Sequence, residues 1–218
     1  MKSRPILFSA PMIRALLAGT KTQTRRICKP QPISVGSAGK RRVYQDSDFK
    51  RAWESIPGTG ECDQDRDCPY GRPGDRLWVK ETFMREPHPS EVGLTRDMIP
   101  ATWDMACAFA GIIHYRADPL SEIAADGRNW RPSIFMPRKA SRLTLEVVSV
   151  RVERLQEISE ADAIAEGVHM ADDEPDMRWN PVQAYRHLWE SINGAGSWDA
   201  NPWVWVVEFK LVGNGGVA

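Results

Sequence analysis

A basic segment in the second half of the chain carries side chains suited to nucleic-acid contact. Residues 128–142 read RNWRPSIFMPRKASR, with five basic side chains, no acid, and the rings of Trp130 and Phe135 among them. Basic side chains bind phosphate and aromatic rings stack on unpaired bases, a combination typical of single-stranded RNA sites. The segment therefore predicts RNA contacts with Trp130 as the stacking ring, and a merely solvated loop is the alternative. Phosphate contacts are expected from Arg138, Lys139 and Arg142.

Charge is distributed unevenly along the chain. The full sequence has 29 basic and 29 acidic side chains, yet residues 1–51 contain twelve Lys or Arg against two acids. Residues 153–176 contain nine acids, and Arg154 is the one Lys or Arg among them. This polarity predicts a surface with one basic and one acidic region. The basic N-terminal quarter strengthens the expectation of an RNA partner.

Length and composition predict one soluble globular domain over residues 1–218. The chain has 42% hydrophobic and 27% charged residues, and a chain of this length folds without support from a metal or disulfides. No stretch reaches the roughly 18 to 20 apolar residues of a membrane-spanning helix, because Pro11 and Arg14 interrupt the apolar N-terminus. We therefore expect a cytoplasmic protein that makes no membrane contact.

Cysteine and histidine positions do not form a recognisable metal motif. Cys62 and Cys68 are separated more widely than the paired ligands of a structural zinc site, and His88, Cys107 and His114 lie apart from them. Buried reduced thiols are the expected state, with a zinc site as the alternative. No glycine-rich loop precedes a helix, so no phosphate-bearing cofactor is predicted either.

The elements that must position these side chains begin with a strand over residues 5–9 and a helix over residues 10–18. Ser9 is suited to the N-cap of this helix, and Gly19 to its C-terminal stop. The dense polar segment 20–26 follows directly. The helix end therefore sets where this segment starts in space.

Hydrophobic spacing predicts the remaining elements. The clearest strand covers residues 141–155, where Leu143, Leu145 and Val147 alternate with polar residues. Ser159 is expected to cap the helix that follows. Other strands are expected at residues 77–79, 112–115 and 202–212, and helices at 160–166 and 182–192.

Strands dispersed in this way predict an α+β fold: a small mixed β-barrel flanked by about three helices. Closing the sheet removes its edges, and the helices cover its exposed faces. Two polar segments, at about 29–74 and 85–110, contain much Gly, Pro, Ser and charge and are expected to be long loop insertions.

Several segments resemble the ASCH family, a branch of the PUA-like RNA-binding folds, and in particular its phage and prophage members. The family signature, Gly-x-Lys followed by a basic residue, matches Gly19, Lys21 and Arg26 within GTKTQTRR. The likeness continues through residues 71–83 and 131–168 and through the segment SINGAGSWDANPWVWVVEF. It covers most of the chain outside the insertions and implies a PUA-like barrel whose partner is RNA or a modified nucleoside.

The resemblance also implies an activity. One branch of the family is similar to a metal-independent amidohydrolase that removes the acetyl group of N4-acetylcytidine with a Lys, a Thr and a Glu. The matching positions here are Lys21, Thr24 and Glu81. Thr24 would be the nucleophile and Lys21 its base, with the pKa of Lys21 lowered by burial or by its neighbours Arg25 and Arg26. Lys21 and Thr24 can converge only if residues 20–25 form a loop or turn.

Three alternatives accompany this hypothesis. A ribonuclease would use Lys21 and Arg26 to stabilise phosphorane charge. A non-catalytic module would bind RNA or modified DNA through the same residues. In a purely structural interpretation, Lys21 and Glu81 form a buried ion pair and Thr24 is a cap. In the enzyme interpretations, one basic cleft beside Glu81 is expected to contain Lys21, Arg25, Arg26, Arg138 and Arg142.

Overall fold

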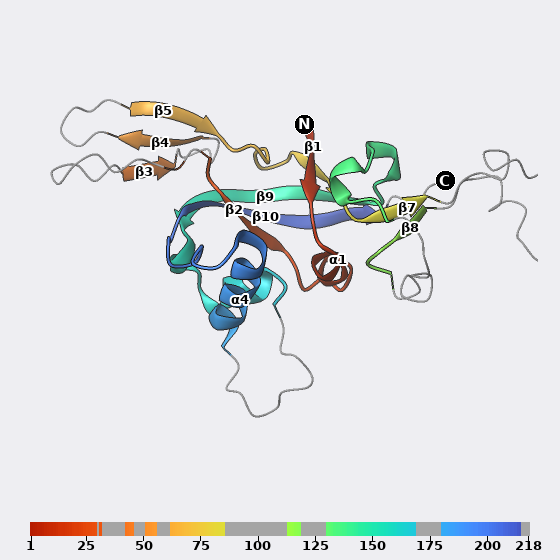
Figure 1. Cartoon of the computed structure of the whole chain (residues 1–218). Helices are drawn as coiled ribbons and strands as arrows, with labels where there is room; N and C mark the ends of the chain where they lie inside the picture. Colours follow the sequence, from red (N-terminus) through yellow and green to blue (C-terminus); the bar gives the residue numbers. More distant parts are fainter. Residues whose placement is uncertain are drawn as a thin grey trace, which may run out of the picture.

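The computed structural model describes residues 1–29, 31, 42–45, 51–55, 62–85, 113–118, 130–168 and 180–214. For residues 42–45, 51–55, 62–67 and 213–214 the description covers the backbone only. The largest element is a five-stranded sheet with the order β1-β6-β9-β10-β2 (Figure 1). Its strands are β1 (Ser3–Leu7), β2 (Gln23–Ile27), β6 (Arg76–Lys80), β9 (Leu143–Arg154) and β10 (Trp203–Asn214).

The sheet is mixed. β1 runs parallel to β6, whereas β6, β9, β10 and β2 pair antiparallel in turn. β9 and β10 are twelve residues each and form the long central pair. Their ladder shifts register between Glu208 and Phe209, an irregularity of the kind that bends a strand. The long bent pair lets one sheet curl around its own core.

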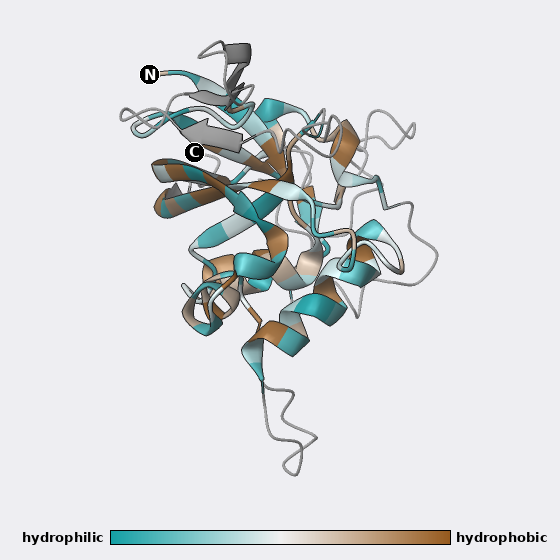
Figure 2. Ribbon diagram, turned by 90° about the vertical axis from the view of Figure 1, so that its left-hand side faces the viewer, coloured by the Kyte–Doolittle hydropathy of each residue, from teal (hydrophilic) through white to brown (hydrophobic). Residues whose placement is uncertain are grey.

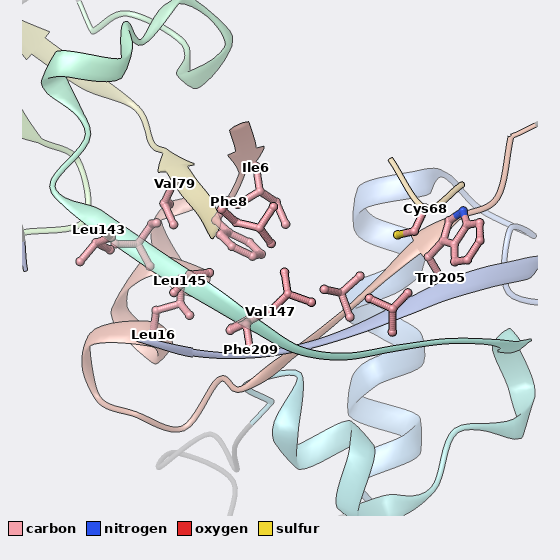
Figure 3. Close-up of a cluster of buried hydrophobic side chains, with 14 of the residues drawn as sticks. Ile6, Phe8, Leu16, Cys68, Val79, Leu143, Leu145, Val147, Trp205 and Phe209 are labelled. Atoms are coloured by element: carbon pink, nitrogen blue, oxygen red, sulfur yellow. The ribbon is translucent and has the colours of Figure 1, made fainter. Parts of the chain in front are cut away.

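The main core lies on the inner face of this curled sheet (Figure 3). Leu143, Leu145 and Val147 of β9 are buried at every second position, as predicted from their alternation. Phe209 of β10 contacts the ring of Phe8 at 6.1 Å between centroids. β1 contributes Ile6, β6 contributes Leu77 and Val79, and β10 also contributes Trp205 and Val207.

Helices cover the sheet at its edge and on its outer face. The α-helices described are α1 (Ala10–Leu17), α3 (Glu160–Ala165) and α4 (Pro181–Asn193), which confirms about three helices. Ser159 caps α3 as predicted, because its side chain accepts a hydrogen bond from the Asp162 amide at 3.1 Å. Hydrophilic and hydrophobic residues alternate along these elements (Figure 2). The apolar residues of α3, α4 and β10 form a second core around Ala163, Tyr185, Trp189, Val204 and Val206.

The α+β class is confirmed, but the closed barrel is wrong for the residues that the structure describes. The sheet ends at β1 on one side and at β2 on the other, with no ladder between them. Instead, Nη2 of Arg26 donates to the carbonyl oxygen of Leu7 at 2.6 Å, and its guanidinium lies 5.4 Å from the Phe8 ring centroid. A side chain therefore bridges the two edges, and the backbone edge of β2 stays open.

The first insertion contains strands where a loop was predicted. β3 (Arg42–Gln45), β4 (Arg51–Ser55) and β5 (Cys62–Asp67) form a separate antiparallel sheet, to one side of β9 in Figure 1. The second insertion starts from β7 (Phe83–Arg85) and returns in β8 (Ile113–Tyr115), which pair with each other. Residues 86–112 lie outside the described residues.

Three short 3-10 helices complete the description: η4 (Ser133–Phe135), η5 (Arg138–Ala140) and η6 (Leu155–Glu157). η4 and η5 lie in the basic segment, beside a small core of Phe83, Tyr115, Met136 and Ala140. Within the described ranges, no helix is both long and apolar enough to cross a membrane.

Candidate functional site

Lys21 is placed by the end of α1. Gly19 has φ of +76°, the left-handed conformation that commonly ends helices. The amides of Thr20 and Lys21 then both donate to the carbonyl of Ala15, at 3.0 and 3.1 Å. This turn directs the Lys21 side chain into the protein, where it is fully buried.

The Lys21 ammonium is surrounded by acceptors. Nζ donates to the carbonyl of Gln23 at 2.8 Å and to both the carbonyl and Oε2 of Glu166, at 2.7 and 2.9 Å. Burial lowers the pKa of Lys21 because the charged form loses its hydration; the Glu166 carboxylate opposes this, and Arg26 and Arg25 lower it further. Lys21 therefore has a lowered pKa and shares a short contact with a buried carboxylate.

Thr24 lies in β2, opposite Val207 of β10. The predicted loop over residues 20–25 is therefore only partly observed: residues 20–22 are irregular and the strand begins at Gln23. Thr24 is buried, and no described residue forms a hydrogen bond with its hydroxyl. As a strand residue Thr24 does not cap a helix, so this part of the structural interpretation is wrong.

The Arg25 side chain points to the face of β2 opposite to that of its neighbour Thr24, as strand alternation requires. Its guanidinium pairs with Glu153, with Asp162 at 3.2 Å and with Oε1 of Glu166 at 3.6 Å. Arg151 joins the same group through Asp162 at 3.1 Å and Glu153 at 3.2 Å. Here Arg25 of the basic N-terminal region is paired with three acids of the segment 153–176.

A pocket of about 430 Å³ lies along the open edge of β2. Thr24, Arg25 and Arg26 form its strand wall, Glu166 lies at the end of α3, and Tyr185 belongs to the α4 wall. Leu188, Trp189, Ile192 and Asn193 complete the α4 wall, and Met12, Ile27, Lys29, Pro69 and Tyr70 the remainder. Its volume and its mixture of aromatic and polar residues are those of a small-molecule site.

Glu81 belongs to a different cluster. Its carboxylate accepts two hydrogen bonds from Arg142, Nε to Oε1 and Nη2 to Oε2, both at 3.0 Å. Arg142 also pairs with Asp118 at 2.7 Å and lies 4.0 Å from the Tyr115 ring centroid. Burial raises the pKa of Glu81, although Arg142 opposes the rise. The predicted Lys21–Glu81 ion pair is therefore wrong, because each group has another partner.

The Lys21–Glu166 cluster and the Glu81–Arg142 cluster are connected indirectly, through contacts of Phe8. The amide of Phe8 donates to the carbonyl of Lys80, next to Glu81, and the Phe8 ring centroid lies 5.5 Å from Nζ of Lys21. Among the described residues, no hydrogen bond or ion pair connects Glu81 to Lys21 or Thr24. The structure pairs Lys21 with Glu166, places Thr24 and Glu166 in the lining of one pocket, and leaves Glu81 with Arg142.

The basic segment presents a third feature at the surface. Arg138 and Lys139 are exposed in η5, and Phe135 is 68% exposed. Trp130 is partly buried and lies 5.3 Å from the guanidinium of Arg116. Phe135 is therefore a more accessible stacking ring than Trp130, the ring that the sequence predicts for this role. Neither exposed cation lines the pocket beside β2.

Glu166 is the main site residue that sequence reasoning missed. It caps the C-terminus of α3, where the helix dipole disfavours a carboxylate. An acid before Gly167 at a predicted helix end was therefore a usable signal that a buried cation lies nearby. The aromatic residues of α4 carried no such signal, because Tyr185 and Trp189 have the spacing of ordinary core residues.

No metal-binding cluster is found within the described ranges. Cys28 and Cys68 are buried in the main core. His88 and Cys107 lie outside the described residues, as does the side chain of Cys62. That the expected amidohydrolase needs no metal therefore stays a prediction.

Gly167 allows the chain to pass closely behind Lys21. It has φ of +89°, and a Cβ there would lie 3.0 Å from Cβ of Ala15 and 3.1 Å from Cβ of Lys21. We expect Gly167→Ala to lower the free energy of unfolding by about 2–4 kcal/mol, through backbone strain plus overpacking. Gly196→Ala, with φ of +77° and no atom within 4 Å, is the control that carries the strain alone. Equal losses for the two variants in urea unfolding would contradict the close packing on Lys21.

Comparison with known proteins gives no match. No protein-family model matches the chain, and neither a curated protein nor a solved structure is significantly similar to it. The resemblance to the ASCH family therefore depends on the sequence motifs alone.

Proposed function

We propose that the protein is a metal-independent amidohydrolase that acts on N4-acetylcytidine or a related acylated base. One observation carries the proposal: Thr24 lines the pocket beside β2 together with Glu166, whose carboxylate holds the buried Lys21 at 2.9 Å. A hydroxyl, a carboxylate and an amine of lowered pKa are the groups that acyl transfer requires. We also propose that the curled sheet is a PUA-like fold of the ASCH type, in a cytoplasmic protein.

In the proposed reaction, the Thr24 hydroxyl oxygen attacks the acyl carbon while its proton passes to the Lys21–Glu166 pair. For Lys21 to accept that proton, its own proton must first lie on Glu166. Burial lowers the pKa of Lys21, which favours the neutral amine that this step requires. The carbon–nitrogen bond then breaks, and N4 of the base leaves with a proton returned by the pair. Water hydrolyses the acyl-threonine ester, so the products are cytidine and acetate.

The pocket suits a nucleoside better than a polymer. It is about 430 Å³, within the usual range for small-molecule sites. Tyr185 and Trp189 supply aromatic surface for a base, and Arg26 supplies positive charge. Glu81 lines no part of it, so a catalytic role for Glu81 depends on the sequence motif alone.

A chromatographic assay in EDTA tests the proposal, with N4-acetylcytidine and transfer RNA as parallel substrates. We expect conversion of N4-acetylcytidine to cytidine and acetate, and intact RNA. Shortened RNA without deacetylation would contradict the proposal and support a ribonuclease. If both substrates stay intact while RNA is bound, the amidohydrolase is equally contradicted and a binding module is favoured.

A second candidate function, RNA binding, is favoured by the surface of the basic segment. Ile134 and Phe135 are 61% and 68% exposed, next to the exposed Arg138 and Lys139. The Trp78 ring lies within 5.6 Å of Arg138 and 5.5 Å of Lys80, measured from the ring centroid. Exposed rings among cations are typical of single-stranded RNA sites. This surface would serve either a binding module or an enzyme whose acylated base lies within RNA.

A ribonuclease that uses Lys21 is less well supported. All three hydrogens of the Lys21 ammonium have protein acceptors, and its side chain is fully buried. A phosphate could reach Nζ only by displacing Glu166.

A further inference from the structure

Two cations that line the pocket beside β2, Arg26 and Lys29, have no acidic partner in the described part of the chain. The other two cations of the segment 20–29, Lys21 and Arg25, are both paired with carboxylates. Glu166, which also lines the pocket, is engaged by Lys21 at 2.9 Å and lies 3.6 Å from Arg25. Two positive charges of the pocket lining therefore have no counter-charge among the described residues.

Arg26 is oriented by its contacts with the end of β1. Its Nη2 donates to the carbonyl of Leu7 at 2.6 Å, in an exposed hydrogen bond, and its guanidinium lies 5.4 Å from the Phe8 ring centroid. Its Nη1 donates to no described residue and, unlike Nε, has solvent-accessible surface. A guanidinium held in this way loses little conformational freedom when an anion binds to its remaining N–H groups.

Tyr70 adds a hydroxyl donor to the same part of the pocket. It lines the pocket, it is partly exposed, and no described residue forms a hydrogen bond with its hydroxyl. Burial raises the pKa of Tyr70 and the charge of Arg26 opposes the rise, which requires the two side chains to lie near each other. At neutral pH the phenol is protonated and can donate to an anion.

The remainder of the lining offers apolar surface to an uncharged organic group. Met12, Ile27 and Leu188 line the pocket and are partly exposed, and Ile192 is 53% exposed. A ligand that matches the whole pocket therefore has an anionic end and an apolar or aromatic body.

We propose that Arg26, Lys29 and Tyr70 form a phosphate subsite, so that the ligand of this pocket is a phosphomonoester and not a neutral nucleoside. A phosphomonoester carries nearly two negative charges at neutral pH and so matches the two cations, whereas a carboxylate or a phosphodiester carries one. Arginine and lysine both bind phosphate through charge-assisted hydrogen bonds. The subsite follows from the charges of the lining, and only the choice of a cytosine nucleoside as the organic body rests on the proposed function.

Three ligands that differ only at the 5′ position test the proposal: cytidine 5′-monophosphate, its methyl phosphate ester and cytidine. They carry about two, one and no negative charges, and none has an acyl group to hydrolyse. By isothermal titration calorimetry, we expect the native chain to bind the monophosphate about 10- to 100-fold more tightly than cytidine, with the methyl ester between them.

Two results would overturn the proposal. Equal dissociation constants for the monophosphate and cytidine, or no binding of the monophosphate, would exclude the phosphate subsite. A methyl ester that binds as tightly as the monophosphate would exclude the assignment to a monoester and indicate an internal phosphate of a nucleic acid.

Charge variants place the phosphate in this pocket. Lys29 is exposed and its side chain forms no hydrogen bond or ion pair with a described residue, so Lys29→Glu should fold normally. We expect it to bind the monophosphate at least about 10-fold less tightly, with little change for cytidine. Arg26→Gln should have the same effect, with the thermal unfolding midpoint as the check on its lost contact with Leu7. Lys139→Glu, exposed in η5 and outside the pocket, is the matched control. Equal losses in Lys29→Glu and Lys139→Glu would overturn the proposed location.

The outcomes separate this inference from the proposed function. Hydrolysis of N4-acetylcytidine by the native chain, combined with equal affinity for cytidine and its monophosphate, would leave the amidohydrolase standing and remove the phosphate subsite. Preferential binding of the monophosphate without hydrolysis of N4-acetylcytidine would uphold the subsite and contradict the enzyme.

Discussion

Thr24→Val is expected to lower the rate of N4-acetylcytidine deacetylation by at least about 10³-fold, because it removes the proposed nucleophile. Valine has the shape of threonine and fits a strand such as β2. No described residue hydrogen-bonds the Thr24 hydroxyl, so the substitution breaks no protein hydrogen bond. The measurement is the initial rate of cytidine release, with the thermal unfolding midpoint as the check on folding.

Thr24→Ser is the matched variant for this experiment. Serine keeps a hydroxyl at the same position and should retain much more activity than valine. A folded Thr24→Val protein with native activity would exclude Thr24 as the nucleophile. A loss of equal size in Thr24→Ser and Thr24→Val would indicate that Thr24 acts by packing and not by its hydroxyl.

Glu166→Ala is expected to lower the free energy of unfolding by about 3–5 kcal/mol. The substitution leaves Lys21 without its carboxylate partner, in a position where the lysine side chain is fully buried. It also removes the 3.6 Å contact with Arg25. The double variant Lys21→Met/Glu166→Leu replaces the ion pair by apolar groups of similar volume and should lose much less stability than Glu166→Ala. Urea unfolding of the single and double variants measures the coupling between the two groups.

The pH dependence of Glu166→Ala provides a second measurement. Without Glu166, Lys21 loses the interaction that raises its pKa, so its pKa falls further in the folded state. The unfolded chain then binds more protons than the folded chain at every pH between that lowered pKa and about 10.4, the ordinary lysine value. The stability of Glu166→Ala should therefore rise with pH across this window. A pH-independent loss, or a loss below about 1 kcal/mol, would contradict a buried Lys21–Glu166 pair.

Much of the local structure was predictable because its causes are local. The alternation of Leu143, Leu145 and Val147 depends only on the two-residue period of a strand. The Ser159 cap and the Gly19 helix end likewise depend on the conformational preferences of single residues. Predicted boundaries differ from those of β1, β9 and β10 by one or two residues, because neighbouring strands decide where pairing stops.

Closure of the sheet and the structure of the insertion could not be inferred in this way. Strand order is a property of the folded chain: β1 and β2 are the two edges of the sheet, and the hydrogen bond from Arg26 to Leu7 connects them where a ladder would close a barrel. The strands β3, β4 and β5 lie in a polar stretch whose Gly, Pro and charge content masked their short periodicity.

By itself, the sequence determined the α+β class, about three helices, the long central strand, and the presence of chemically capable side chains at Lys21, Thr24 and Glu81. Only the tertiary structure decided their partners. Lys21 pairs with Glu166, 145 residues away, and Glu81 pairs with Arg142, 61 residues away. The physical reason is that an ion pair forms between whichever charges the packed strands and helices bring within about 4 Å, and no local period encodes that choice.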